Sequence, residues 1–68
     1  MKYLYLNGTK ILFDNDMNLL TFLETQNLSQ KQIAVAINGS VIQKKEYKKI
    51  IVREGDKIEV VHAVGGGK

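Results

Sequence analysis

The 68-residue sequence contains no cysteine and one histidine, His62. The lack of cysteine excludes a disulfide bond, a thiolate metal site and a cysteine nucleophile. A single histidine excludes a histidine-rich metal site. Hydrophobic residues make up 44% of the chain and charged residues 25%, which is ordinary for a globular protein. At this length we expect one small domain with a limited core.

Long hydrophobic runs are also missing. No apolar segment approaches the length that spans a membrane. Asn7-Gly8 interrupts the N-terminal segment before the core of a signal peptide could form. These two absences predict a cytoplasmic protein with no membrane partner.

The sequence also lacks a recognisable catalytic or metal-binding constellation. Nothing in it brings a serine close to His62. Asp14 and Asp16 have the spacing of a metal loop, but the rest of the EF-hand ligand series does not follow. The glycine-rich end has no helix after it, as a phosphate-binding loop requires. We therefore expect no metal, no bound cofactor and no enzymatic activity.

What the chain does have is a glycine tail. Its last residues are Val64-Gly65-Gly66-Gly67-Lys68, so three of the six glycines stand in a row. Such a tail cannot pack, but it can pass through a channel where any Cβ would clash, and it ends in a carboxylate. The alternative is a frayed end or a residue left by cloning. The pattern predicts a domain over residues 1–64 and a flexible tail over residues 65–68.

Positive charge is concentrated in one stretch. The net charge is +3, and five cations fall within ten residues: Lys44, Lys45, Lys48, Lys49 and Arg53. A solvated surface, docking onto an acidic protein partner and phosphate binding all remain open. Only Tyr47 lies inside this cluster, which is thin support for base stacking. We do not expect nucleic acid as a partner.

The first half of the chain predicts a hairpin followed by a helix. Residues 3–6 and 9–13 alternate in polarity on either side of Asn7-Gly8, a strong hairpin signal. Asp16 or Asn18 can cap a helix that runs from Asn18 to Gln26. Its apolar stripe is expected to lie in the core. Asn27 suits the left-handed backbone conformation that ends a helix, and Leu28 is placed for the hydrophobic contact that often accompanies such an end. The stripe consists of Leu19, Phe22 and Leu23.

The second half predicts further strands. Residues 32–38 alternate, with Ile33, Val35 and Ile37 on one face, and Asn38-Gly39 marks a turn into a short strand over residues 40–42. Residues 43–50 are expected to form a loop with at most a turn of helix. Ile51-Val52 is expected to join the sheet, and residues 57–64 form the last strand.

This order of elements predicts an α+β domain with the ubiquitin-like β-grasp arrangement. One main helix must cover one face of a small mixed sheet, since neither layer can bury its apolar face alone. The first and last strands can lie adjacent and parallel, because the helix supplies the long crossover between them.

The sequence resembles the sulfur carrier proteins of thiamine biosynthesis, the ThiS family. The resemblance covers essentially the whole chain, from the Asn7-Gly8 hairpin through residues 19–28 and 33–39 to the tail. Its most specific motif is the series Gly55-Asp56-Lys57-Ile58-Glu59, which runs six residues later into the glycines.

The resemblance implies a carrier cycle. The Gly67 carboxylate would be adenylated by a ubiquitin-activating-type adenylyltransferase (ThiF-like) that uses ATP. Sulfur from a cysteine desulfurase would replace AMP to give a thiocarboxylate. Thiazole synthase (ThiG-like) would then use that sulfur to build the thiazole of thiamine. Gly66 and Gly67 match the family's terminal pair and Gly65 adds a hinge, so Gly65 and Gly66 would serve to thread the tail.

Two departures from the family pattern stand out. Lys68 follows the glycines, whereas the active family form ends in glycine, and Ala63 stands where a larger apolar residue is common. Two other carriers have a similar fold and tail. The molybdopterin-synthase small subunit is typically longer, and ubiquitin-like protein modifiers share the tail chemistry up to the adenylate.

Overall fold

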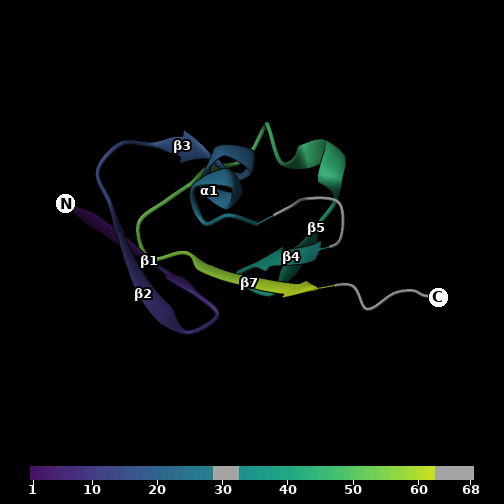
Figure 1. The fold of residues 1–68 in the computed structure, drawn as a ribbon, viewed down its shortest axis with the longest axis horizontal. Helices are drawn as coiled ribbons and strands as arrows, with labels where there is room; N and C mark the ends of the chain where they lie inside the picture. Colours follow the sequence, from purple (N-terminus) through teal and green to yellow (C-terminus); the bar gives the residue numbers. More distant parts are fainter. Residues whose placement is uncertain (29–32, 63–68) are drawn as a thin grey trace.

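The computed structural model describes residues 1–28 and 33–62, which form a sheet with one α-helix on one of its faces (Figure 1). The sheet has five strands in the order β2-β1-β7-β4-β5. Their bounds are Lys2–Leu6 (β1), Thr9–Phe13 (β2), Ile33–Ile37 (β4), Ser40–Ile42 (β5) and Lys57–His62 (β7). The helix α1 spans Leu19–Thr25. The β-grasp prediction is confirmed.

The centre of the sheet is the pair formed by the first and last strands. β1 and β7 run parallel, with Tyr5 opposite Lys57 and Leu6 opposite Ile58. β2 pairs antiparallel with β1, and β4 pairs antiparallel with both β7 and β5. This mixed topology is the one expected when a helix provides the crossover between parallel strands.

The core lies between α1 and the inward face of the sheet. The buried helix residues are the predicted stripe, Leu19, Phe22 and Leu23. They meet inward side chains of the strands, among which Leu4 and Ile58 are at most 1% exposed. A seven-residue helix is too short to be stable alone, so this packing stabilises it.

Polar residues at both ends fix the length of the helix. The Asn18 Oδ1 atom accepts a hydrogen bond from the Thr21 N–H at 2.8 Å, so Asn18 rather than Asp16 is the N-cap. At the other end Asn27 is left-handed with φ of 60°. The Asn27 N–H donates to the Glu24 carbonyl at 3.0 Å, and the Leu28 N–H donates to the Leu23 carbonyl at 2.9 Å. These two bonds form the Schellman motif. The capped helix is therefore slightly shorter than predicted.

The prediction that Ile51-Val52 joins the main sheet is wrong. These residues form β6 (Ile51–Val52), which pairs antiparallel with β3 (Met17–Asn18) in a separate two-stranded sheet. Backbone bonds dock this segment at the start of α1: the Leu19 N–H donates to the Ile50 carbonyl at 2.7 Å, and the Leu20 N–H to the Tyr47 carbonyl at 3.2 Å. The unsatisfied donors of the first helical turn thus draw the chain away from the main sheet.

The segment before β6 contains a core residue. A turn of 3₁₀ helix, η2 (Lys44–Glu46), matches the predicted turn of helix in this region. Tyr47 follows it and is only 1% exposed. Burial raises the pKa of the Tyr47 hydroxyl above its usual value. Tyr47 is thus an anchor for the basic stretch and not a stacking surface.

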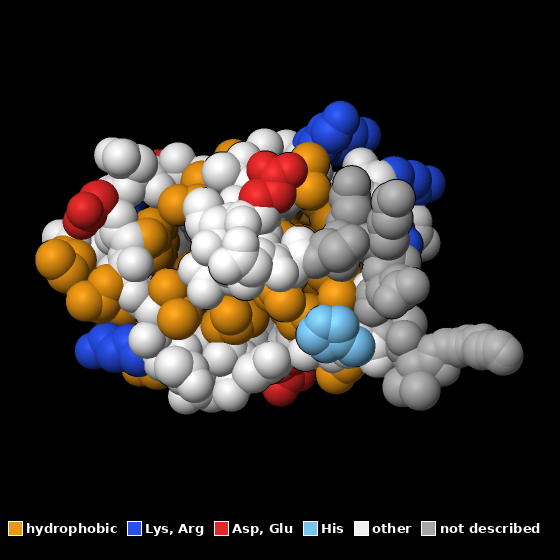
Figure 2. Space-filling model, viewed as in Figure 1, with side chains coloured by type: hydrophobic (Ala, Val, Ile, Leu, Met, Phe, Trp, Pro, Cys, Tyr) orange, Lys and Arg blue, Asp and Glu red, His pale blue; other side chains and the backbone are white. Residues whose placement is uncertain are grey.

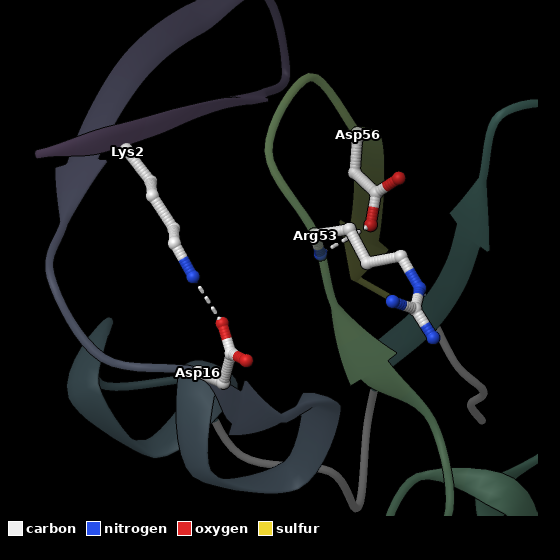
Figure 3. A network of polar contacts seen from close by, with 4 residues as sticks. All are labelled: Lys2, Asp16, Arg53 and Asp56. Carbon is white, nitrogen blue, oxygen red and sulfur yellow. Dashed lines mark hydrogen bonds and ion pairs between the residues drawn. The ribbon is translucent and has the colours of Figure 1, made fainter.

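An ion pair links the start of β1 to the loop before β3. The Lys2 ammonium contacts the Asp16 carboxylate (Figure 3). The hydrogen bond and charge of Lys2 lower the pKa of Asp16 below its ordinary value of 3.8, and the Arg53 charge adds to the effect. The stabilisation is therefore present above the unfolded-state pKa and is lost as the pH falls through the lower folded-state pKa.

We expect Lys2→Met to raise the pKa of Asp16 back toward its ordinary value, because both main interactions that lower it come from Lys2. NMR titration of the Asp16 side chain measures this directly. Lys10→Met is the control, since Lys10 lies over the Tyr3 ring instead. Added salt should reduce the difference in the pKa of Asp16 between wild type and Lys2→Met, because the Lys2 and Asp16 side chains are exposed and salt screens their attraction. Identical Asp16 titration curves in wild type and Lys2→Met would contradict the assignment.

Candidate tail-presenting site

The strand that leads into the glycine tail is the middle strand of the sheet. β7 lies between β1 and β4, and its last residue, His62, is opposite Ile33. The predicted tail residues, Gly65, Gly66 and Gly67, together with Ala63 and Lys68, lie outside the described residues. The sequence therefore attaches the tail to a strand that pairs with β1 near its start and with β4 as far as His62.

Two asparagine side chains reinforce β7, one from each hairpin turn. The Val60 N–H donates to Asn7 Oδ1 at 2.8 Å, and Asn7 Nδ2 donates back to the Val60 carbonyl at 3.1 Å. On the other side the Lys57 N–H donates to Asn38 Oδ1 at 3.0 Å. Each asparagine thus pairs with the β7 backbone as a neighbouring strand would.

The same asparagines also shape their turns. Asn7 and Gly8 have φ of 51° and 84°, and Asn38 and Gly39 have 51° and 87°. Positive φ at both central residues is the geometry of the two-residue hairpin turn. The sequence predicted the turns from these dipeptides, but it gave no signal that the amides would reach β7.

The turn into β7 is held by Asp56. Its Oδ2 atom accepts from the Arg53 N–H at 2.8 Å, as Figure 3 shows, and its Oδ1 accepts from Asn38 Nδ2 at 3.1 Å. Gly55 has φ of 87°, and its N–H donates to the Tyr3 carbonyl at 2.8 Å. The predicted turn over residues 54–56 is confirmed, and it docks the start of β7 onto β1.

The sheet face opposite α1 carries exposed apolar side chains. Alternation turns Glu59 and Val61 of β7 outward, together with their partners Ala36 and Ala34 on β4. Val61 is 61% exposed. Farther along this face, the Tyr3 and Tyr5 rings meet edge to face with centroids 5.7 Å apart. This face also has a shallow hollow of about 220 Å³. It is lined by residues 34–36, Val41, Glu59 and Val61.

The predicted basic residues lie in two segments of the chain. Lys44, Lys45, Lys48 and Lys49 are exposed in and just after η2, where Figure 2 shows lysine and arginine side chains at the upper right. Arg53 is exposed too, but it follows β6 and belongs to the turn that leads into β7. The structure therefore groups the four lysines and places Arg53 at the entry to β7.

His62 is exposed (pale blue in Figure 2), and no hydrogen bond to its side chain is formed within the described residues. Over residues 1–28 and 33–62, no group of three or more His, Asp or Glu side chains could hold a metal ion. In the same ranges no helix is long and apolar enough to cross a membrane.

A model of the ThiS family matches residues 3–67. The chain belongs to the ThiS family. It is 34% identical over 65 residues to the sulfur carrier protein ThiS of Bacillus subtilis, a match that covers 94% of this chain and 98% of that protein. The crystal structure of the thiamine biosynthesis protein ThiS from Geobacter metallireducens superposes with a TM-score of 0.83. The match is 26% identical and covers 96% of this chain and 99% of that one.

A second kind of relative is an enzyme. The thiazole synthase of Paramagnetospirillum magneticum is 31% identical over 64 residues, which are 94% of this chain but 20% of the synthase. The thiazole synthase of Magnetococcus marinus shows the same coverage of its own length. A ThiS-like region is thus part of the synthase chain in these proteins. Family membership makes the present protein a small sulfur carrier of thiamine biosynthesis and not an enzyme.

We expect Asn7→Gly to destabilise the domain by about 1–3 kcal/mol, the cost of leaving buried backbone groups without partners. Glycine keeps the left-handed turn accessible, and a second Asn→Gly variant accounts for the extra freedom that glycine gives the unfolded chain. Chemical denaturation gives the free energy of unfolding, and amide hydrogen exchange at Val60 reports the local effect. Asn15→Gly, in the exposed loop after β2, is the control. Equal stability and equal Val60 protection in the two variants would contradict a reinforcing role for Asn7.

Proposed function

We propose that Gly67 is the working terminus of this carrier. The observation that carries the proposal is that the family match runs through Gly67 and ends before Lys68. A carboxylate oxygen of Gly67 attacks the α-phosphate of ATP in the active site of the adenylyltransferase, and pyrophosphate leaves. Persulfide sulfur from the cysteine desulfurase displaces AMP from the acyl carbon to give an acyl disulfide, and a thiol reductant then cleaves the S–S bond, which leaves the thiocarboxylate.

The glycines suit this cycle because they add length without bulk. Gly67 is five residues beyond His62, so a fully extended tail carries its carboxylate roughly 17 Å from the end of β7. With no Cβ on Gly65 or Gly66, the backbone fits a narrow channel that leads to a buried reaction centre. The carrier holds no cysteine that could trap its sulfur in an internal disulfide.

Thiazole synthase is the proposed recipient of the sulfur. The support is that two thiazole synthases carry a region similar to this chain within their own sequence. A covalent link keeps such a region at high effective concentration near the active site. A separate carrier lacks that advantage and must find its partners by surface recognition.

The proposal makes a direct prediction for Lys68. The 68-residue chain should be inert, because the Gly67 carbonyl is then an amide and has no anionic oxygen to attack ATP. Removal of Lys68 should allow ATP–pyrophosphate exchange with the cognate adenylyltransferase. With the sulfur donor, mass spectrometry should show one terminal oxygen replaced by sulfur. Equal exchange by both chains, with no proteolysis, would exclude Gly67 as the working terminus.

A matched tail variant separates threading from folding. In the chain that ends at Gly67, Gly66→Ala should slow exchange by roughly 100-fold, since a displacement of about 1 Å at the reacting atom costs that much. Its free energy of unfolding should match that of the parent.

We also propose that the basic residues steer the encounter with the activating partner. Lys44, Lys45, Lys48, Lys49 and Arg53 are exposed, as this role requires. Long-range attraction between opposite charges raises association rates and is screened by salt. Arg53, which lies apart from the lysines, would contribute from the entry to β7.

Charge reversal tests this proposal. Lys45→Glu and Lys48→Glu should each slow association with the adenylyltransferase severalfold at low salt, with rates that converge at high salt. Lys10→Glu changes the net charge equally but lies on β2, so it is the matched control. Stopped-flow association kinetics supply the rates. If Lys10→Glu slows association as much as the other two, the effect belongs to net charge and not to this cluster.

A further inference from the structure

The outer edge of β2 carries backbone groups that point away from the sheet. β2 is an edge strand whose neighbour is β1. On β1, the Tyr3 and Tyr5 backbone groups bond toward β7, so they do not bond to β2. Tyr3 lies opposite Leu12 and Tyr5 opposite Lys10. In an antiparallel pair, opposed residues that do not bond each other turn their N–H and carbonyl groups outward. Lys10 and Leu12 therefore offer two donors and two acceptors along the free edge.

The usual protection of an edge strand is weak on β2. Natural edges are often guarded by charged side chains, proline or a bulge. β2 contains no proline, and Lys10 is its one charged residue. The Lys10 ammonium lies over the Tyr3 ring of β1, 5.0 Å from the ring centroid. Its charge is thus turned back over the sheet, and the edge remains open to a further strand.

A groove of about 320 Å³ lies beside this edge, between β2 and the end of α1. Its lining includes Phe13 and Phe22, which are 8% and 1% exposed, and it is bordered by Thr25 and Gln26. A strand added to β2 would lie about 4.8 Å from it, and every second side chain of that strand would point toward the helix. A cavity of roughly 150 Å³ can hold benzene, so the groove has room for about two aliphatic side chains.

The charge beside the groove is negative. Of the described residues that line it, Asp14 alone is charged. Asp14 directly follows β2 and is exposed, and within residues 1–28 and 33–62 it forms no ion pair. The nearby Asp16 carboxylate is instead paired with Lys2. A basic residue in the added strand would therefore find its partner at the Asp14 end of the edge.

A segment bound at this edge would leave the carrier's working parts accessible. β1 separates β2 from β7, the strand that leads into the tail (Figure 1). The four lysines of the basic stretch follow β5, which is the opposite edge of the sheet. Two thiazole synthases hold a ThiS-like region near their active site by a covalent link. A bound segment would raise the effective concentration of a separate carrier without such a link.

We propose that the β2 edge binds an extended segment of a partner protein, which pairs antiparallel with β2 as an additional strand. The segment carries two aliphatic side chains two residues apart, which enter the groove, and it is preceded by lysine or arginine beside Asp14. Main-chain hydrogen bonds to Lys10 and Leu12 supply affinity, and the groove and Asp14 supply specificity. This tether is a function beyond the sulfur cycle, because it does not involve the tail.

The test uses the isotope-labelled 68-residue chain and the blocked probe peptide Arg-Arg-Thr-Ile-Thr-Ile-Thr. In NMR, the probe should slow amide hydrogen exchange severalfold at Lys10 and Leu12. Ile11 and Phe13 should change little, because their N–H groups already face β1. The control peptide Arg-Arg-Thr-Ile-Ile-Thr-Thr has the same composition without the alternation, and it should bind severalfold more weakly.

A matched pair of helix variants tests the groove. Thr25→Arg should weaken probe binding by about tenfold or more, because it fills the groove and opposes the arginines of the probe with a like charge. Thr21→Arg is the control, since Thr21 is also exposed on α1 but does not line the groove. Its Kd should stay within about twofold of the parent value. An equal loss of affinity in both variants would overturn the proposal.

A second pair of variants tests the edge itself. Leu12→Pro should weaken binding severalfold, because it removes an outward N–H at a position where an edge strand tolerates proline. Leu12→Ala keeps that N–H and should lose less affinity. Thermal unfolding should show that the variants are folded. If Leu12→Pro does not fold, the comparison of Thr25→Arg with Thr21→Arg decides the question.

Three other results would also overturn the assignment. The first is an absence of probe binding, and the second is a set of peptide-induced changes confined to other strands. The third is protection of Lys10 and Leu12 that rises with protein concentration and without peptide, since the edge would then bind a second copy of the chain. ATP–pyrophosphate exchange by the chain that ends at Gly67 should be unchanged at saturating probe, and inhibition would contradict a tether. The binding measurements need no exchange, so they stand or fall separately from the proposed role of Gly67.

Discussion

The pairing of β7 on both of its edges is the constraint on which the rest of the structure depends. β1 bonds to one edge in parallel register and β4 to the other in antiparallel register. Neither neighbouring strand pairs with the whole length of β7, because each ends in a hairpin turn. The Asn7 and Asn38 side chains continue the pairing from those turns. The helix then has a continuous surface to cover, with Ile58 and Val60 of β7 in its centre.

Much of this fold could be predicted from the sequence, because its turns and caps are local. Asn7-Gly8 and Asn38-Gly39 specify hairpins through backbone preference alone. Asn18 and Asn27 mark the two ends of α1 by the hydrogen bonds and φ that their positions require. The β3–β6 pair could not be predicted, since two-residue strands carry no periodicity. Tyr47 was missed because its polar, basic neighbours conceal a position that only tertiary packing buries.

The candidate site, too, could be predicted from the sequence only in part. The glycine tail is visible in the sequence because its chemistry depends on consecutive residues. The hollow is not, because it arises only when β4, β5 and β7 lie side by side. In the sequence, Ala34 and Ala36 are small residues that alternate with Ile33 and Val35. In the structure Ala34 lies opposite Val61, and both alanines line the hollow. Arg53 is likewise separated from the four lysines by β6, which pairs with β3.

The position of β7 also decides how the domain bears a mechanical load. A force applied to the end of β7 along the strand axis would be carried first by its pairing with β4, which reaches His62. The ladder to β4 has its hydrogen bonds across that axis, as antiparallel pairs do. Such bonds share a lengthwise pull as a group and must shear together. A tail attached to β2 or β5 would load a strand that has a neighbour on one edge only. A load on β7 is instead shared with two neighbouring strands.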